Sequence, residues 1–270
     1  MGQSDIETAK IESTAAGPAA NPIAALLPTP FMERLVEPLF SESERAGLAA
    51  RFLGAPLAYA CARACRSTGV NLEALHGQAA FESIHSHRMR SQAVALAGEL
   101  AGEGICAVAF KGLATALGVY PQPVYRLLPD VDFLFREEDL PRLAESLAAR
   151  GYCTGIPPGA ARAWGVLATA SFAPIFQPDN PFALDVHRAV DEPPASLGLD
   201  TELIFARAVP VETEWGSCTV SAHEHSFAIA ALNLYRDFYR PEALKGLFDG
   251  CLIISRFGDT LDWRHIEAVA

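Results

Sequence analysis

The sequence lacks an apolar run long enough to cross a membrane. A transmembrane helix needs about 20 consecutive, mostly apolar residues, and no such stretch occurs in the 270-residue chain. The N-terminus also lacks the basic region and the apolar segment of a secretory signal. We therefore expect no membrane partner and a cytoplasmic location.

Metal-binding patterns of cysteine and histidine are absent as well. The chain contains no Cys-x-x-Cys pair, and its six cysteines are scattered: Cys61, Cys65, Cys106, Cys153, Cys218 and Cys251. Single cysteines in a cytosolic protein are mostly small buried apolar residues. We expect structural thiols here, in preference to zinc ligands or a catalytic thiol.

Positive charge is scarce. Lys and Arg together number 21 against 32 Asp and Glu, and the formal net charge is −11. A nucleic-acid-binding surface needs clustered basic residues, so we do not expect nucleic acid as a partner. Single nucleotides held through metal ions remain compatible with this charge. The sequence also has no P-loop, no Rossmann glycine fingerprint and no Gly-x-Ser-x-Gly elbow.

The segment 105–135 carries the most information. It begins with an apolar run of strand length, 105–110, which Lys111 and Gly112 follow at once. A helix-compatible stretch over 113–119 comes next, then a proline-containing loop and a second strand-like run over 130–135. This order predicts two strands that are joined through a glycine turn, a short helix and a loop.

Two aspartates lie in the second of these strands. Because alternate side chains of a strand share a face, Asp130 and Asp132 point the same way, while Val131 and Phe133 point the other way. Neighbouring carboxylates repel each other and are costly to desolvate, so such a pair usually holds a cation. Mg²⁺ prefers oxygen ligands of this kind. From spacing alone, a strand end with two solvated aspartates remains an equal alternative.

The wider pattern resembles a known superfamily. A strand, Lys-Gly, a helix, a loop with an arginine and then Asp-x-Asp on the next strand resemble the polymerase beta-like nucleotidyltransferases. The motifs also resemble, more narrowly, an uncharacterised bacterial nucleotidyltransferase family that is often seen beside peptide and polysaccharide biosynthesis genes. These motifs are Phe110-Lys111-Gly112, Tyr120-Pro121, Arg126-x-x-x-Asp130-Val131-Asp132-Phe133-Leu134 and Gly151-Tyr152, with Leu247-Phe248-Asp249 and Leu261-Asp262-Trp263 in the helical tail.

The resemblance implies a fold and an activity. The fold would be α+β, with a small mixed sheet flanked by helices and with helical subdomains at both ends of the chain. The activity would be transfer of a nucleotidyl group to a small molecule, peptide or protein. The expected donor is ATP and the expected group is AMP. Two Mg²⁺ ions would assist, and such two-metal chemistry needs about three carboxylates.

The third carboxylate is predicted from a neighbouring strand. Asp185 lies in the apolar run 182–188 after a turn, and the resembling family has an acidic-x-His motif on this strand, which His187 completes. The alternative is an exposed residue on an edge strand. His187 is a secondary candidate, either as a general base or as a residue that orients Asp185 or binds substrate.

Phosphate-binding residues are predicted just before the first helix. Gly112 lets the backbone approach a phosphate at a helix N-terminus, and Lys111 adds a positive charge. Many members of the superfamily have Gly-Ser here, so one hydroxyl contact is missing. Lys111 as a surface residue stays an alternative. Arg126 is a candidate either for phosphate binding or for pairing with an aspartate, and Asp249 is expected to bond locally or to face solvent.

Two other functions remain open. One is a catalytically inactive member of the fold that acts as a binding subunit of a biosynthetic complex, which the missing serine motivates. The other is one half of a toxin–antitoxin pair that adenylylates a partner. The sequence contains no code for the acceptor, because acceptor pockets lie in loops and helices without transferable motifs.

We expect four segments along the chain: a loosely attached N-terminus over 1–28, an N-terminal helical subdomain over 29–103, the nucleotidyltransferase-like core over 104–220 and a C-terminal helical subdomain over 221–270. Helices are predicted over 31–53, 55–67, 71–103, 137–150, 201–207, 221–237 and 241–257, and from 262 onward. Further strands are predicted over 152–155, 171–177, 182–188 and in a pair within 209–220. Asn71 and Asp262 are predicted N-caps, and Ser221 with Glu224 a capping box.

Overall fold

The computed structural model describes residues 43–65, 70–154, 170–171, 175–178, 180, 182–192 and 199–269. Several predictions lie outside these residues: the loosely attached segment 1–28, the first part of the helix over 31–53 and the last two residues of the helix over 55–67. The turn at 178–181 is described only in part.

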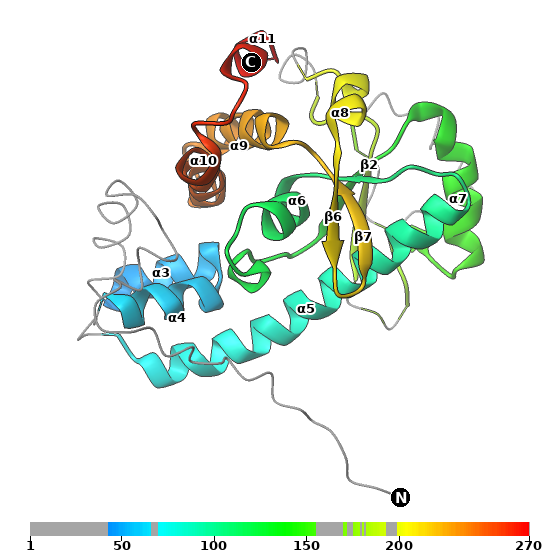
Figure 1. The fold of residues 1–270 in the computed structure, drawn as a ribbon. Helices are drawn as coiled ribbons and strands as arrows, with labels where there is room; N and C mark the ends of the chain where they lie inside the picture. Colours follow the sequence, from blue (N-terminus) through cyan, green and yellow to red (C-terminus); the bar gives the residue numbers. More distant parts are fainter. Residues whose placement is uncertain are drawn as a thin grey trace, which may run out of the picture.

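A mixed sheet forms the centre of the fold (Figure 1). Within the described residues it has seven strands, in the order β3-β4-β5-β2-β1-β7-β6. Two neighbouring pairs, β1 with β7 and β2 with β5, are parallel, and the other pairs are antiparallel. The strands are β1 (Val108–Ala109), β2 (Val131–Leu134), β3 (Cys153–Thr154), β4 (Ile175–Phe176), β5 (Ala183–His187), β6 (Val209–Thr213) and β7 (Gly216–Val220). The predicted hairpin of β4 and β5 is confirmed.

Helices cover both faces of the sheet and extend beyond it (Figure 1). They are α3 (Ser43–Leu53), α4 (Ala55–Ala64), α5 (Leu72–Gly102), α6 (Lys111–Gly118), α7 (Leu140–Ala149), α8 (Thr201–Arg207), α9 (His223–Asp237), α10 (Ala243–Phe257) and α11 (Trp263–Val269). Two 3₁₀ turns, Pro123–Tyr125 and Glu137–Asp139, precede β2 and α7. The chain is therefore α+β, as the sequence predicts.

The two faces of β2 pack against different layers. Val131 and Phe133 are fully buried in a core with α5, α7 and the inner side of β5. The opposite face carries Asp132 and Leu134, and Leu134 packs against Ile229 of α9 in a second apolar cluster. The alternation of side chains along β2 therefore directs Asp132 toward α9 and away from α5.

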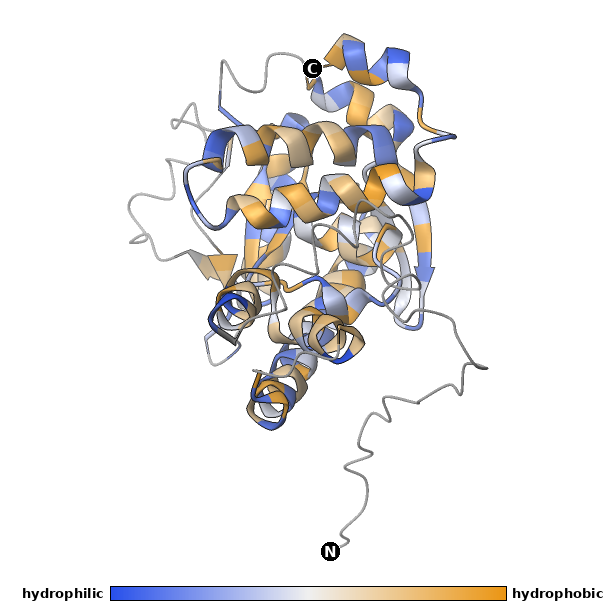
Figure 2. Ribbon diagram, turned by 90° about the vertical axis from the view of Figure 1, so that its left-hand side faces the viewer, coloured by the Kyte–Doolittle hydropathy of each residue, from blue (hydrophilic) through white to orange (hydrophobic). Residues whose placement is uncertain are grey.

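The helices at the two ends of the described chain share a core. Buried side chains of α3 and α4 pack with Phe248, Leu252 and Ile253 of α10. Figure 2 shows apolar and polar residues mixed along the helices, and no helix in the described ranges is long and apolar enough to span a bilayer. The predicted domain limits at 103/104 and 220/221 stay predictions.

Two of the three predicted helix caps are present. Asn71 Oδ1 accepts a hydrogen bond from the Ala74 N–H at 3.0 Å, and Asp262 Oδ1 accepts one from the His265 N–H at 3.1 Å. These side chains satisfy N–H groups that the helix itself leaves unpaired.

The predicted capping box at α9 is wrong. The N-cap is Ala222, and no side chain caps the helix. The Ser221 N–H donates to the Ala109 carbonyl at 2.9 Å, so strand pairing continues through Ser221 and the helix begins after it. Glu224 instead accepts a hydrogen bond from the Asp262 N–H at 3.1 Å, which joins α9 to the turn before α11.

Candidate active site

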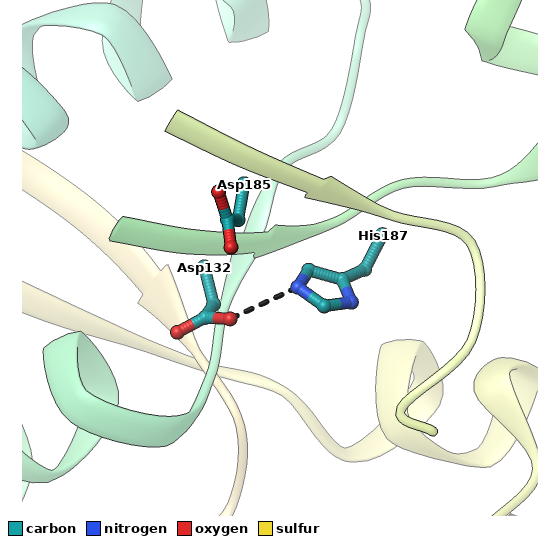
Figure 3. Close-up of side chains that lie close together, drawn as sticks. All are labelled: Asp132, Asp185 and His187. Atoms are coloured by element: carbon teal, nitrogen blue, oxygen red, sulfur yellow. Dashed lines mark hydrogen bonds and ion pairs between the residues drawn. The ribbon is translucent and has the colours of Figure 1, made fainter. Parts of the chain in front are cut away.

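Adjacent parallel strands bring Asp132 and Asp185 together. β2 and β5 pair in a register that places these two residues directly opposite each other, with Leu134 opposite His187. Asp132, Asp185 and His187 each offer one ligand atom, and these atoms all lie within 4.8 Å of one another (Figure 3). β5, the strand that the sequence predicted as the partner, therefore places Asp185 and His187 beside Asp132.

Asp130 lies on the same cleft as Asp132 and Asp185 but outside the compact group of three ligand atoms. It lies just before β2 and lines the cleft that Asp132 and Asp185 also line. The compact group within 4.8 Å contains His187 in its place. Asp130 nevertheless contributes to the same electrostatic field, because its charge raises the pKa of Asp185.

Asp132 is held by two donors. Its Oδ1 accepts a hydrogen bond from Lys111 Nζ at 2.7 Å and lies 2.9 Å from His187 Nε2. Because an ionised carboxylate only accepts, His187 Nε2 is the donor in this contact. Burial alone raises the pKa of Asp132, but the hydrogen bond from His187 and the charge of Lys111 outweigh it, so the pKa lies below its ordinary value.

The pKa values of Asp185 and Asp130 are raised, in contrast to that of Asp132. Burial, and then the charges of Asp132 and Asp130, raise the pKa of Asp185 to about 6. Burial and the charge of Asp132 raise the pKa of Asp130, although Lys111, Lys245 and Arg126 partly oppose this. The cluster therefore carries more negative charge than its own cations neutralise, which is the electrostatic condition that favours a bound cation.

The three aspartates face a cleft of about 260 Å³ between the sheet and the C-terminal helices. All six primary site residues predicted from the sequence line this cleft: Lys111, Gly112, Arg126, Asp130, Asp132 and Asp185. The opposite wall is formed by α9, α10 and the turn between them, and it includes Arg236, Glu242, Lys245 and Asp249. The structure thus brings the predicted residues to one cavity, with a wall that the sequence did not indicate.

The phosphate-site candidates lie where the sequence placed them, but the helix starts earlier. α6 begins at Lys111, two residues before the predicted start, and Lys111 has a φ of 51°. That left-handed conformation is uncommon for a residue other than glycine. A Cβ atom at Gly112 would meet Leu128 Cδ2 at 3.0 Å and Arg126 Cζ at 3.7 Å. Because Gly112 has no Cβ, it allows the close approach of α6 to the loop that precedes β2 and contains Arg126 and Leu128.

Arg126 pairs with an aspartate, but with neither Asp130 nor Asp132. Its Nε and Nη2 donate to Oδ1 and Oδ2 of Asp249, both at 2.9 Å, and the Tyr120 hydroxyl donates to Oδ1 at 2.9 Å. Asp249 is 4% exposed, so the expectation that it bonds locally or faces solvent is wrong. The reason is tertiary: α10 brings Asp249 against an arginine 123 positions earlier in the chain.

Lys245 is a cleft residue that the sequence analysis missed. It lies on α10, and no hydrogen bond or ion pair joins its Nζ to any part of the chain that the structure describes. Burial and the charge of Arg126 lower its pKa, whereas Asp130, Glu242 and Asp249 oppose the shift. A lone lysine on an amphipathic helix gives no sequence signal of this placement.

Comparisons with known proteins show the family of the chain. No curated protein matches the chain. Among solved structures, the chain is similar to an antigenic nucleotidyltransferase-like protein from Paracoccidioides brasiliensis, with a TM-score of 0.45 and 14% identity over 68% of this chain and 86% of that chain. The family described as uncharacterised nucleotidyltransferase matches residues 49–270, and this chain therefore belongs to that nucleotidyltransferase family.

Proposed function

We propose that the protein is a metal-dependent nucleotidyltransferase that moves a nucleotidyl group, AMP from ATP, onto a hydroxyl or another nucleophile of an acceptor. The observation that carries the proposal is the register of β2 and β5, which sets Asp132 opposite Asp185 at the wall of a cleft. Asp130 lines the same cleft. Family membership supports the reaction class, and the chemistry of these residues supports the metal.

The residues present fit a hard divalent cation. Asp132 and Asp185 supply carboxylate oxygens, Asp130 is a further oxygen donor beside them, and mutual repulsion raises the pKa of Asp130 and Asp185. Mg²⁺ binds through one or two carboxylates together with substrate phosphates. In this role, bound divalent cations polarise phosphate oxygens and activate the attacking hydroxyl.

His187 fits an orienting role better than that of a general base. Its Nε2 donates to Asp132, and its Nδ1 is buried without a hydrogen-bond partner in the described part of the chain. The ring also packs edge-on against Phe110, with centroids 4.9 Å apart. A base must reach the proton that it removes, whereas Nε2 is engaged with Asp132 and His187 is not among the residues that line the cleft. We assign His187 to holding the carboxylate of Asp132 in place.

The triphosphate would lie between α6 and α10. The first N–H groups of a helix have no partner within the helix and favour anions. α6 presents this end to the cleft at Lys111 and Gly112, while Lys245 approaches from the other wall. These groups replace the hydroxyl contact that the missing serine would have supplied. Arg126 lines the same cleft, but its guanidinium is paired with Asp249, so we assign it to holding α10 against the loop before β2.

The reaction then follows from these positions. An acceptor oxygen forms a bond to the α-phosphorus, the bond from that phosphorus to the bridging oxygen breaks, and pyrophosphate leaves, while the acceptor proton passes to solvent. The carboxylates would hold the cations, which would supply charge stabilisation, and Lys111 and Lys245 would stabilise the leaving pyrophosphate. Positioning and electrostatics are the main contributions that such a site makes.

The direct test is transfer of label from α-labelled nucleoside triphosphates, with Mg²⁺ or Mn²⁺, to candidate small-molecule, peptide and protein acceptors. We expect metal-dependent labelling or pyrophosphate release that Asp132→Asn and Asp185→Asn abolish. The matched control is Asp259→Asn, an exposed residue outside the cleft. Nucleotide binding without turnover, and with unchanged biological function in both site variants, would favour the inactive binding subunit. Labelling of one protein partner alone would favour the toxin–antitoxin alternative.

A further inference from the structure

Lys111 is paired with one carboxylate oxygen of Asp132, a residue of the candidate metal site. Its Nζ lies 2.7 Å from Asp132 Oδ1, the same atom that accepts the hydrogen bond from His187. Only three lysines occur in the chain, and two of them, Lys111 and Lys245, line this cleft. The ammonium group of Lys111 thus supplies a positive charge in direct contact with the Asp132 carboxylate.

The backbone fixes this ammonium group close to the aspartate. Lys111 adopts a φ of 51° at the first position of α6, and from there its Nζ reaches Asp132 of β2. The Phe110 ring lies 4.9 Å from Nζ and adds a cation–π contact. Residues in uncommon backbone conformations cluster at functional sites, which is consistent with a functional role for Lys111.

A divalent cation and the lysine ammonium compete for the same place. Asp132 Oδ1 already accepts two donors, and a divalent cation bound to the same carboxylate would meet the charge of Lys111 at close range. Like charges that are near each other and partly buried repel strongly. A cation that binds Asp132 and Asp185 must therefore either weaken the Lys111–Asp132 ion pair or displace Lys111 from Oδ1.

Lys111 has room to leave. Its side chain is 21% exposed, compared with 9% for Asp132, and both line the cleft. The neighbouring N-terminus of α6 is the predicted phosphate site, so a triphosphate would offer Lys111 a new anionic partner within reach of side-chain rotation alone. No backbone movement is needed for such an exchange.

We propose, on the basis of the nucleotidyltransferase function above, that Lys111 is an internal counter-ion that neutralises the carboxylate cluster until nucleotide arrives and then moves from Asp132 to the phosphates. The exchange couples metal and nucleotide binding. Metal alone binds weakly because it competes with Lys111, whereas the metal–nucleotide pair binds well because the phosphates take over the lysine. By linkage, each ligand then strengthens the binding of the other.

The test measures Mn²⁺ binding to the full chain without nucleotide, by electron paramagnetic resonance of free Mn²⁺. Lys111→Met should bind Mn²⁺ about tenfold more tightly than the natural protein, because a charge-assisted contact to Asp132 is removed. The matched control is Lys245→Met, which removes the same charge from the same cleft but has no contact with Asp132. Its effect on Mn²⁺ alone should be clearly smaller. Lys111→Gln serves as a second variant if Lys111→Met does not fold.

A second arm measures binding of a non-hydrolysable ATP analogue at saturating Mg²⁺. Lys111→Met should weaken this binding by about tenfold, opposite in sign to its effect on the metal alone. An unchanged or weaker affinity of both Lys111 variants for Mn²⁺ alone would overturn the inference. Failure of the natural protein to bind the metal–nucleotide pair would instead refute the proposed function, so the two failures are distinguishable.

Discussion

Arg126 and Asp249 form a bidentate ion pair that ties the loop before β2 to α10. Arg126 is 8% exposed, and its third nitrogen donates to the Leu127 carbonyl at 2.8 Å. The Tyr120 hydroxyl completes the shell around Asp249. Asp130 and Asp132 follow Arg126 within six positions. The Arg126–Asp249 ion pair therefore fixes the start of β2 relative to the α10 wall of the cleft.

Breaking this ion pair should destabilise the fold strongly. Asp249→Asn leaves the guanidinium of Arg126 buried without a counter-charge, and removal of one partner of a buried pair costs about 3–5 kcal/mol. Urea unfolding followed by circular dichroism gives the free energy of unfolding. Asp259→Asn, at an exposed position, should change it by less than about 0.5 kcal/mol.

A double variant separates the uncompensated charge from lost packing. Arg126→Met with Asp249→Leu removes both charges and should recover much of the free energy of unfolding that Asp249→Asn loses. If the double variant is as unstable as the sum of the two single variants, the two residues act independently and the ion-pair account is wrong.

Gly112→Ala should reduce the free energy of nucleotide binding more than it reduces the free energy of unfolding. The added Cβ would lie 3.0 Å from Leu128 Cδ2 at the wall of the cleft, so the Leu128 side chain must give by a few tenths of an ångström. The added methyl group and the displaced side chain lie at the predicted phosphate site and should raise the dissociation constant of an ATP analogue about tenfold, as calorimetry would show.

Gly98→Ala is the matched control for this change. Gly98 lies on an exposed position of α5 with nothing within 4 Å of an added Cβ. Alanine there should stabilise the protein by about 0.5–1 kcal/mol, since glycine is unfavourable within a helix, and should leave nucleotide binding unchanged. Equal effects of both alanines on binding would contradict the role assigned to Gly112.

The fold should lose stability in mild acid through His225. This histidine is 1% exposed, and its Nε2 lies 2.9 Å from His265 Nε2. Burial, then His265 and Arg207, lower the pKa of His225 to about 4, against the opposing charge of Glu224. The unfolded chain, with an ordinary pKa near 6.5, binds the proton more readily, so stability is present above about pH 6.5 and is lost as the pH falls toward 4.

The expected loss from this residue is about 2 kcal/mol between pH 7.5 and pH 5, measured by urea unfolding at each pH. His225→Leu should remove that part of the pH dependence, whereas His76→Gln, at an exposed position, should preserve it. A natural protein that is equally stable at both pH values would rule out a buried, neutral His225.

Local pattern was sufficient to predict the acidic side of the site. The period of two along β2 places Asp130 and Asp132 on one side, and the turn before β5 with its Asp-x-His pattern indicates the partner strand. Parallel pairing of β2 with β5 then sets Asp132 against Asp185 in register. Most helix limits follow from the same short-range signals, whereas the α+β fold was expected from the family resemblance.

The other wall of the cleft could not be predicted from local pattern. Asp249 and Lys245 lie on α10, more than a hundred positions after β2. Asp249 belongs to the Leu247-Phe248-Asp249 motif of the resembling family, but the motif does not show which residues Asp249 contacts. The failed capping box at Ser221 has a related cause, because pairing of β7 with β1 extends the strand through the expected cap. Tertiary contacts determined each of these outcomes.

The most direct test of the account is Mn²⁺ binding, with an ATP analogue present, to the natural protein and to Asp132→Asn and Asp185→Asn. We predict that each variant binds the metal at least about tenfold more weakly than the natural protein, while Asp259→Asn binds it equally well. Undiminished Mn²⁺ binding by both site variants would contradict the central claim that these facing carboxylates hold the cation.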